Sequence, residues 1–108
     1  MGRKQRTKQL STSGDALPVF LRWQGVPVAL YSYSISHLKL QLRLVREWNK
    51  HYLIIECSDV KFITGPTKWE QANFTLDFIS ANEVILSDEP AQFEVLAGAV
   101  MVYEVIDR

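Results

Sequence analysis

From Leu17 onward, apolar and polar residues alternate along most of the chain, which is the pattern of half-buried β-strands. The clearest case is the segment 37–44, in which every second residue is a leucine and Lys39, Gln41 and Arg43 stand between them. In an extended chain these leucines share one face, whereas a helix would scatter them around its circumference. The spacing therefore predicts a strand in this segment.

Turn signals separate the other apolar segments at intervals of about 8–12 residues, which is typical of antiparallel all-β domains. The expected strands are 19–23, 26–35, 37–44, 52–57, 59–63, 74–78, 84–86 and 92–106. Gln24-Gly25 between the first two predicts a hairpin turn, and helix is expected only as one turn near Leu10 or between Arg46 and Lys50. The predicted fold class is all-β, as a small antiparallel barrel or a compact sandwich of about seven to eight strands with little helix.

Two segments are apolar on both faces of an extended chain. One is 52–57, which is expected to be a central strand, and the other is 95–102 around Gly98. Because an exposed apolar strip of that length favours aggregation, the second segment must be covered. It is interpreted as a strand buried on both faces, as a hairpin turning at Ala97-Gly98, or as a strand whose outer face is a subunit interface. The candidate interface residues in the last case are Leu96, Val100 and Val102.

Residues 1–16 are polar and lack a periodic apolar pattern, so they are predicted to form a flexible basic arm before a single β domain over 17–108. Such an arm can contact phosphates by releasing counterions, or an anionic membrane surface. The candidate anion or nucleic-acid contacts are Arg3, Lys4, Arg6 and Lys8 in the arm, with Lys39 and Arg43 beyond it. Stacking aromatics for a single-strand platform would come from Trp23, Trp48 and Trp69. The alternative is that these tryptophans fill the core.

Composition fits one packed domain, because 108 residues with 47% apolar side chains can bury a substantial core. The net charge is zero, but residues 1–50 carry nine basic and two acidic side chains, whereas residues 51–108 carry three basic and ten acidic ones. This division predicts cross-strand pairing of a basic with an acidic half, or a dipolar surface that steers a charged partner or drives head-to-tail association.

No residue pattern in the chain points to catalysis, a metal or a cofactor. Cys57 is the only cysteine, so it excludes an internal disulfide, fits a reducing compartment and is expected to be a small buried apolar residue. His51 would lie about 20 Å from Cys57 on one strand, too far for the two to act together. Catalysis would require a cleft that unites His51, Glu56 and Asp59. Enzymatic activity is left open but not favoured, and no catalytic residue, metal ligand or cofactor is expected.

These features favour a non-catalytic interaction module that associates with another protein, in the first place with itself. Two alternatives are a nucleic-acid-binding protein that uses the basic arm and a β-barrel that encloses a small apolar ligand. No segment has the length of a signal-peptide core or of a membrane span. A cytoplasmic protein without a membrane span is therefore expected.

Overall fold

The computed structural model describes residues 5–10, 16–47 and 50–107, and for residues 5–10, 47, 106 and 107 it describes the backbone alone. Its elements are β1 (Gln5–Leu10), α1 (Ala16–Arg22), β2 (Val28–Ser34), β3 (Lys39–Glu47), β4 (His51–Ser58), β5 (Phe62–Thr64), β6 (Lys68–Trp69), β7 (Phe74–Ser80), β8 (Glu83–Asp88), β9 (Phe93–Ala97) and β10 (Ala99–Asp107). The prediction of an all-β fold with little helix is confirmed. No helix in the described ranges is long and apolar enough to cross a membrane.

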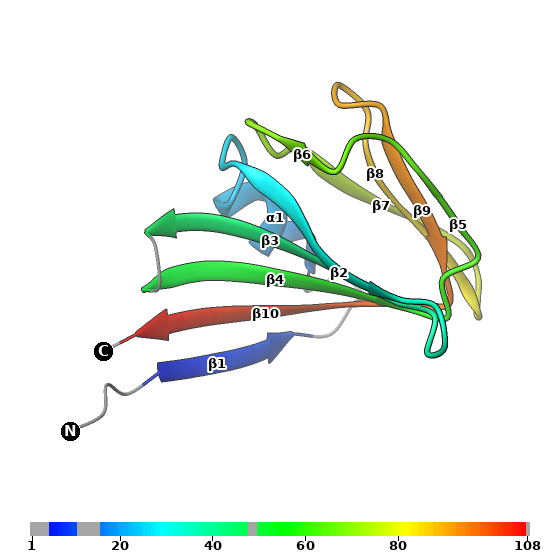
Figure 1. Ribbon diagram of the computed structural model, residues 1–108, viewed down its shortest axis with the longest axis horizontal. Coiled ribbons are helices and arrows are strands. Elements are labelled where there is room, and N and C mark those ends of the chain that lie inside the picture. The colour runs from blue at the N-terminus through cyan, green and yellow to red at the C-terminus, as the bar shows by residue number, and fades with distance from the viewer. Residues whose placement is uncertain (1–4, 11–15, 48–49, 108) are drawn as a thin grey trace.

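The strands form two antiparallel sheets that do not close into a barrel. The larger sheet has six strands in the order β1-β10-β4-β3-β2-β6, and the smaller has four in the order β5-β9-β8-β7. Figure 1 shows the smaller sheet at one end of the larger one, with the two sheets splayed apart. Each sheet therefore keeps two edge strands, β1 and β6 in the larger and β5 and β7 in the smaller.

The predicted strand over 19–23 is wrong, because this segment lies in α1 and the turn that follows it. The buried residues here are Ala16, Val19, Phe20 and Trp23. Their spacing of three and four residues places them on one face of a helix. Gly25 then adopts φ 84°, the left-handed conformation with which helices commonly end. The turn at Gln24-Gly25 therefore ends a helix and does not join two paired strands.

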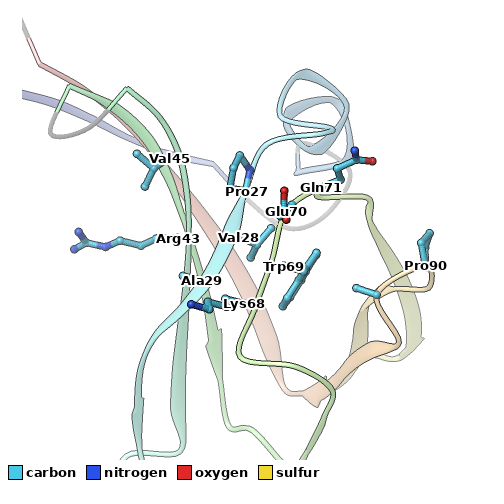
Figure 2. Close-up of a pocket in the computed structure, with 11 residues that line it drawn as sticks. Pro27, Val28, Ala29, Arg43, Val45, Lys68, Trp69, Glu70, Gln71 and Pro90 are labelled. Atoms are coloured by element: carbon cyan, nitrogen blue, oxygen red, sulfur yellow. The ribbon is translucent and has the colours of Figure 1, made fainter.

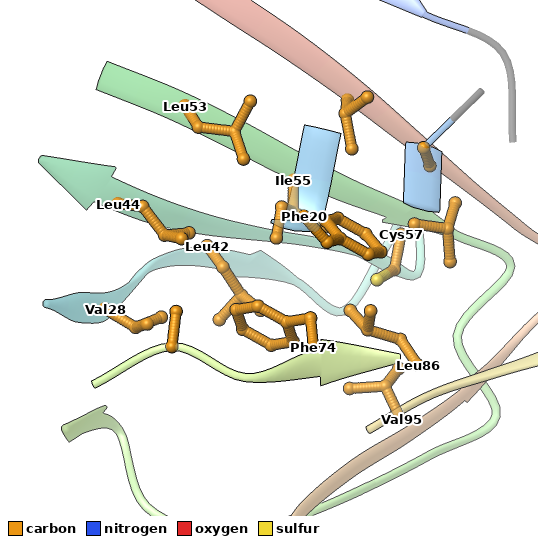
Figure 3. Close-up of a cluster of buried hydrophobic side chains, with 14 of the residues drawn as sticks. Phe20, Val28, Leu42, Leu44, Leu53, Ile55, Cys57, Phe74, Leu86 and Val95 are labelled. Atoms are coloured by element: carbon orange, nitrogen blue, oxygen red, sulfur yellow. The ribbon is translucent and has the colours of Figure 1, made fainter. Parts of the chain in front are cut away.

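The core lies against the inner face of the larger sheet, where β3, β4 and β10 carry cross-strand rows of buried side chains. These rows are Leu40, Cys57 and Val100, then Leu42, Ile55 and Val102, then Leu44 and Leu53. Phe20 from α1 packs on them, together with Leu86 and Val95 from the smaller sheet (Figure 3). The helix and the smaller sheet thus cover the same side of the larger sheet.

Gln5–Leu10, which the sequence assigned to a flexible arm, form the edge strand β1 and pair with residues 102–107 of β10. An extended polar segment can satisfy the backbone hydrogen-bonding groups that β10 would otherwise leave open at the sheet edge. Residues 1–4 and 11–15 of the predicted arm lie outside the described residues. The division into an arm and a domain over 17–108 stays a prediction.

The expected long strand over 92–106 is divided at Gly98, where the chain passes from one sheet to the other. β9 ends at Ala97 in the smaller sheet, β10 begins at Ala99 in the larger one, and the two strands do not pair. The hairpin considered at Ala97-Gly98 is therefore wrong. A Cβ atom at Gly98 would lie 2.9 Å from both Cβ and Oδ2 of Asp59, so a larger residue does not fit this corner.

Replacing Gly98 with alanine is expected to lower the free energy of unfolding by about 1–3 kcal/mol, because the added methyl group overlaps Asp59. Chemical denaturation measures the change. Asp59 has φ 53°, which glycine tolerates, so Asp59→Gly removes the overlap without straining the backbone. In the Asp59→Gly background the same substitution should cost far less. An equal cost in both backgrounds would contradict this role of Gly98.

Candidate functional site

The outer face of the larger sheet carries apolar and aromatic side chains on its central strands. Cross-strand pairing forms one row from Val45, Tyr52 and Val105, a second from Arg43, Ile54 and Tyr103, and a third from Gln41, Glu56 and Met101. The Arg43 side chain extends to Tyr31 on β2. We call the following set the tyrosine face: Tyr31, Arg43, Val45, Tyr52, Ile54, Met101 and Tyr103.

Nothing in the described part of the chain covers the tyrosine face. α1 and the smaller sheet both contribute to the core on the inner side of the larger sheet. Members of the tyrosine face on β3, β4 and β10 keep partial exposure, and Tyr31 on β2 is 57% exposed. Antiparallel sheets with one face in water ordinarily carry polar residues there. The tyrosine face departs from that pattern.

Arg43 is held between two aromatic rings. Its guanidinium carbon lies 3.6 Å from the ring centroid of Tyr31 and 5.0 Å from that of Tyr52. Among the described side chains no carboxylate forms an ion pair with Arg43, and its buried Nε atom has no hydrogen-bond partner. Cation–π contacts contribute about 0.5–2 kcal/mol each. The two rings, and not a carboxylate, therefore hold the guanidinium.

The remaining polar groups on this side of the sheet largely neutralise each other. Lys39 Nζ lies 3.8 Å from Glu56 Oε2, and Gln41 Nε2 donates a 3.0 Å hydrogen bond to Glu56 Oε1. Burial and the nearby charge of Glu56 raise the pKa of Tyr103, so its hydroxyl stays neutral. Arg43 therefore carries the one charge of the tyrosine face.

The structure brings only two of the predicted anion contacts together. Lys39 and Arg43 lie on the same side of β3. β1, which holds Arg6 and Lys8, is separated from β3 by β10 and β4, a distance of about 14 Å. Of the predicted contact and stacking residues, Arg3, Lys4, Arg6, Lys8 and Trp48 have side chains outside the described part. The aromatic neighbours of Arg43 are tyrosines and not the tryptophans expected from the sequence.

The three predicted interface residues lie in different environments. Val100 and Val102 are 0% exposed and point into the core, so neither offers surface to a partner in this conformation. Leu96 is partly exposed on the outward side of β9, in a cross-strand row with Phe62 and Ile85. On β10, Met101 and Tyr103 instead face outward and keep partial exposure.

His51, Glu56 and Asp59 do not share a cleft. His51 and Glu56 are five residues apart on β4, so they face opposite sides of the sheet, and Asp59 follows the far end of the strand. Burial, with a smaller effect of Glu56, raises the pKa of the Cys57 thiol to about 12, which makes it a poor nucleophile. Among the described residues, no group of three or more His, Cys, Asp or Glu side chains could hold a metal ion.

Glu104 anchors the C-terminal end of α1 to β10. Its carboxylate accepts hydrogen bonds from Arg22 Nη2 and Trp23 Nε1, each at 3.2 Å, and His51 Nε2 lies 3.5 Å away without a hydrogen bond. The Arg46 guanidinium lies over the Trp23 ring, 4.3 Å from its centroid, and donates to the backbone carbonyl of Arg22. Burial alone would raise the pKa of Glu104, but the hydrogen bond from Trp23 and the charge of Arg22 outweigh it and lower the pKa.

A hollow of about 970 Å³ opens where β6 pairs with β2, at the margin of the tyrosine face. It is lined by Pro27, Val28, Ala29, Arg43, Val45, Lys68, Trp69, Glu70, Gln71, Pro90 and Ala91. Figure 2 shows Trp69 and Pro90 on one side of β2 and Arg43 on the other. The hollow therefore continues around the short edge strand β6.

No known protein family, curated protein or solved structure matches this chain. Functional inference therefore depends on the geometry of its own surfaces. Sequence reasoning did not single out Tyr31, Tyr52 and Tyr103. The signal that could have found Tyr52 and Tyr103 was that 52–57 and the last strand are apolar on both faces.

Acidification is expected to destabilise the protein through Glu104. Because its pKa in the folded protein lies below the ordinary 4.5, its stabilising effect is complete above pH 4.5 and is lost as the pH falls through the folded-state pKa. Glu104→Gln should lower the free energy of unfolding at pH 7 by about 1–3 kcal/mol. The variant should also lose part of the loss of stability that the wild-type protein shows as the pH falls below 4.5.

Urea titrations at several pH values measure both effects. Glu94→Gln removes a carboxylate at an exposed position of β9 and is the matched control, because no described side chain pairs with Glu94. If Glu104→Gln and the wild-type protein lost stability equally on acidification, the anchoring role of Glu104 would be refuted.

Proposed function

We propose that this protein is a non-catalytic interaction module that pairs with a second copy of itself through the tyrosine face. One observation carries the proposal: β4 and β10 present apolar side chains on both sides, and Tyr52, Ile54, Met101 and Tyr103 on the outer side stay partly exposed, whereas the described elements bury the inner side. Removing apolar surface from water contributes about 25 cal/mol per Å². A second copy placed on the tyrosine face would bury the side that the chain itself leaves open.

The size of the tyrosine face supports a protein partner. Strands lie about 4.8 Å apart and rise about 3.3 Å per residue, so the four strands that carry the tyrosine face, with about eight residues each, give a flat area of roughly 400–500 Å². Side chains increase the accessible area above this value. A specific interface buries about 800 Å² on each partner, so the tyrosine face would form the centre of the interface and neighbouring residues of the sheet its rim.

The chemistry of the tyrosine face supports an identical partner. Tyrosine, methionine and arginine are enriched in the cores of protein interfaces, and charged groups are depleted there. Lys39 and Glu56 pair with each other, and the charge of Arg43 lies over aromatic rings, so two copies can approach without strong repulsion. Two such sheets would stack about 10 Å apart, as in a sandwich.

The two alternatives from the sequence have less support. A nucleic-acid strand needs a basic groove, whereas Arg43 is the only charge of the tyrosine face and Lys39 is paired. An enclosed apolar ligand needs a closed barrel, and we infer instead a compact two-sheet sandwich with open edges. Both alternatives stay predictions.

Ile54→Glu is expected to abolish self-association, because it places a carboxylate at the centre of the face that the second copy would cover. Light scattering coupled to gel filtration measures the molar mass over a range of protein concentrations. The wild-type protein should show a concentration-dependent dimer, and the variant should stay monomeric with an unchanged far-ultraviolet circular dichroism spectrum.

Ile85→Glu is the matched control, because Ile85 is a partly exposed isoleucine on the outward side of the smaller sheet. This variant should dimerise as the wild-type protein does. A wild-type protein that remains monomeric at all concentrations and salt conditions would overturn the proposal. Loss of the dimer in Ile85→Glu but not in Ile54→Glu would move the interface to the smaller sheet.

A further inference from the structure

We propose that the hollow beside β6 binds a small amphiphilic anion, a carboxylate or phosphate group attached to an apolar body. The proposal does not depend on self-association, because it requires only side chains of β2, β3, β6 and the β8–β9 turn in one chain. The volume of about 970 Å³ lies in the upper range of small-molecule sites. Its lining combines two cations with a mainly apolar wall.

The cationic part of the hollow lies across three paired strands. Lys68 on β6 and Arg43 on β3 are both cross-strand partners of Ala29 on β2. The two cations therefore flank one small residue on the same side of the sheet, with their backbones about 10 Å apart. Long side chains on either side of an alanine leave room for an anionic group above it.

Arg43 is already arranged to receive such a group. The rings of Tyr31 and Tyr52 hold its guanidinium, and no described carboxylate neutralises it. A guanidinium fixed in this way loses little freedom when it forms paired hydrogen bonds to a carboxylate or phosphate. Lys68 likewise forms no ion pair with another described residue.

The apolar part of the hollow is held in place by a buried carboxylate. Asp88 is 0% exposed and accepts hydrogen bonds from Trp69 Nε1 at 2.7 Å, from the Asn73 backbone at 2.9 Å and from the Ala91 backbone at 3.4 Å. These contacts join the segment after β6 to the β8–β9 turn, which form the two walls. Because the indole N–H of Trp69 donates to Asp88, Trp69 presents the carbon atoms of its ring to the hollow.

Among the described residues that line the hollow, Glu70 is the one carboxylate, and Arg43 and Lys68 are two cations. The excess of positive charge favours an anion over a cation or a neutral molecule of the same shape. The lining also has apolar surface on both sides of β2, from Val45 on the side of Arg43 and from Trp69 and Pro90 on the other side (Figure 2), which favours an anion with an aromatic or aliphatic body over a bare inorganic ion.

Nuclear magnetic resonance titrations with three probes test the proposal on the full chain. The probes are 1-naphthoate, the uncharged 1-naphthalenemethanol and inorganic phosphate. Naphthoate should bind with a dissociation constant on the order of 1 mM, and should shift the backbone amides of Ala29 and Lys68 and the indole N–H of Trp69. The uncharged probe and phosphate alone should each bind at least about threefold more weakly.

Arg43→Gln and Lys68→Gln should each weaken naphthoate binding by about threefold or more. Lys61→Gln is the matched control, because Lys61 is an exposed lysine in an ion pair with Glu83 on the smaller sheet. It should bind naphthoate as the wild-type protein does. Three results would each overturn the proposal. The charged and uncharged probes could bind equally, Lys61→Gln and Lys68→Gln could have equal effects, or naphthoate on the order of 10 mM could cause no shift near Ala29.

Discussion

Burial of the inner face of the larger sheet is the interaction on which the rest of the structure depends. The leucines of β3 continue as apolar rows across β4 and β10. These rows are covered by two different elements. The smaller sheet packs against part of this surface with Leu86 and Val95, and α1 packs against another part with Phe20 (Figure 3). Glu104 fixes the helix there, and Gly98 lets the chain pass from the smaller sheet to the larger one.

Coverage of one side of the sheet leaves the opposite side open, and this asymmetry links the fold to function. In most antiparallel sheets an open side is polar, so nothing further needs to be buried. Here β4 and β10 keep Ile54, Met101 and two tyrosines on that side, with Arg43 stacked on the rings of Tyr31 and Tyr52. The same residue, Arg43, also borders the hollow at β6, so the proposed dimer face and the proposed anion site are neighbours on one surface.

Local patterns in the sequence were sufficient for β3, β4 and β8, because strict alternation or a short apolar run leaves one strong interpretation. They failed at α1, where Val19, Phe20 and Leu21 favour strands and hide the helical spacing of Ala16, Val19, Phe20 and Trp23. Long-range pairing could not be derived either. Arg22 and Glu104 are 82 residues apart, and only the order of strands in the sheet brings β10 beside the helix. The sequence likewise indicated that 52–57 is apolar on both faces, but which face is covered depends on where α1 and the smaller sheet pack.

Mixed isotope labelling tests most directly whether a second copy covers the tyrosine face. In an equal mixture of ¹³C-labelled and unlabelled protein, isotope-filtered nuclear Overhauser spectroscopy detects contacts between copies and not within one. Pairing through the tyrosine face predicts contacts from the methyl groups of Ile54 and Met101 to the rings of Tyr52 and Tyr103 in the other copy. Contacts between copies confined to Phe62 and Leu96 on the smaller sheet, or no such contacts at any concentration, would contradict it.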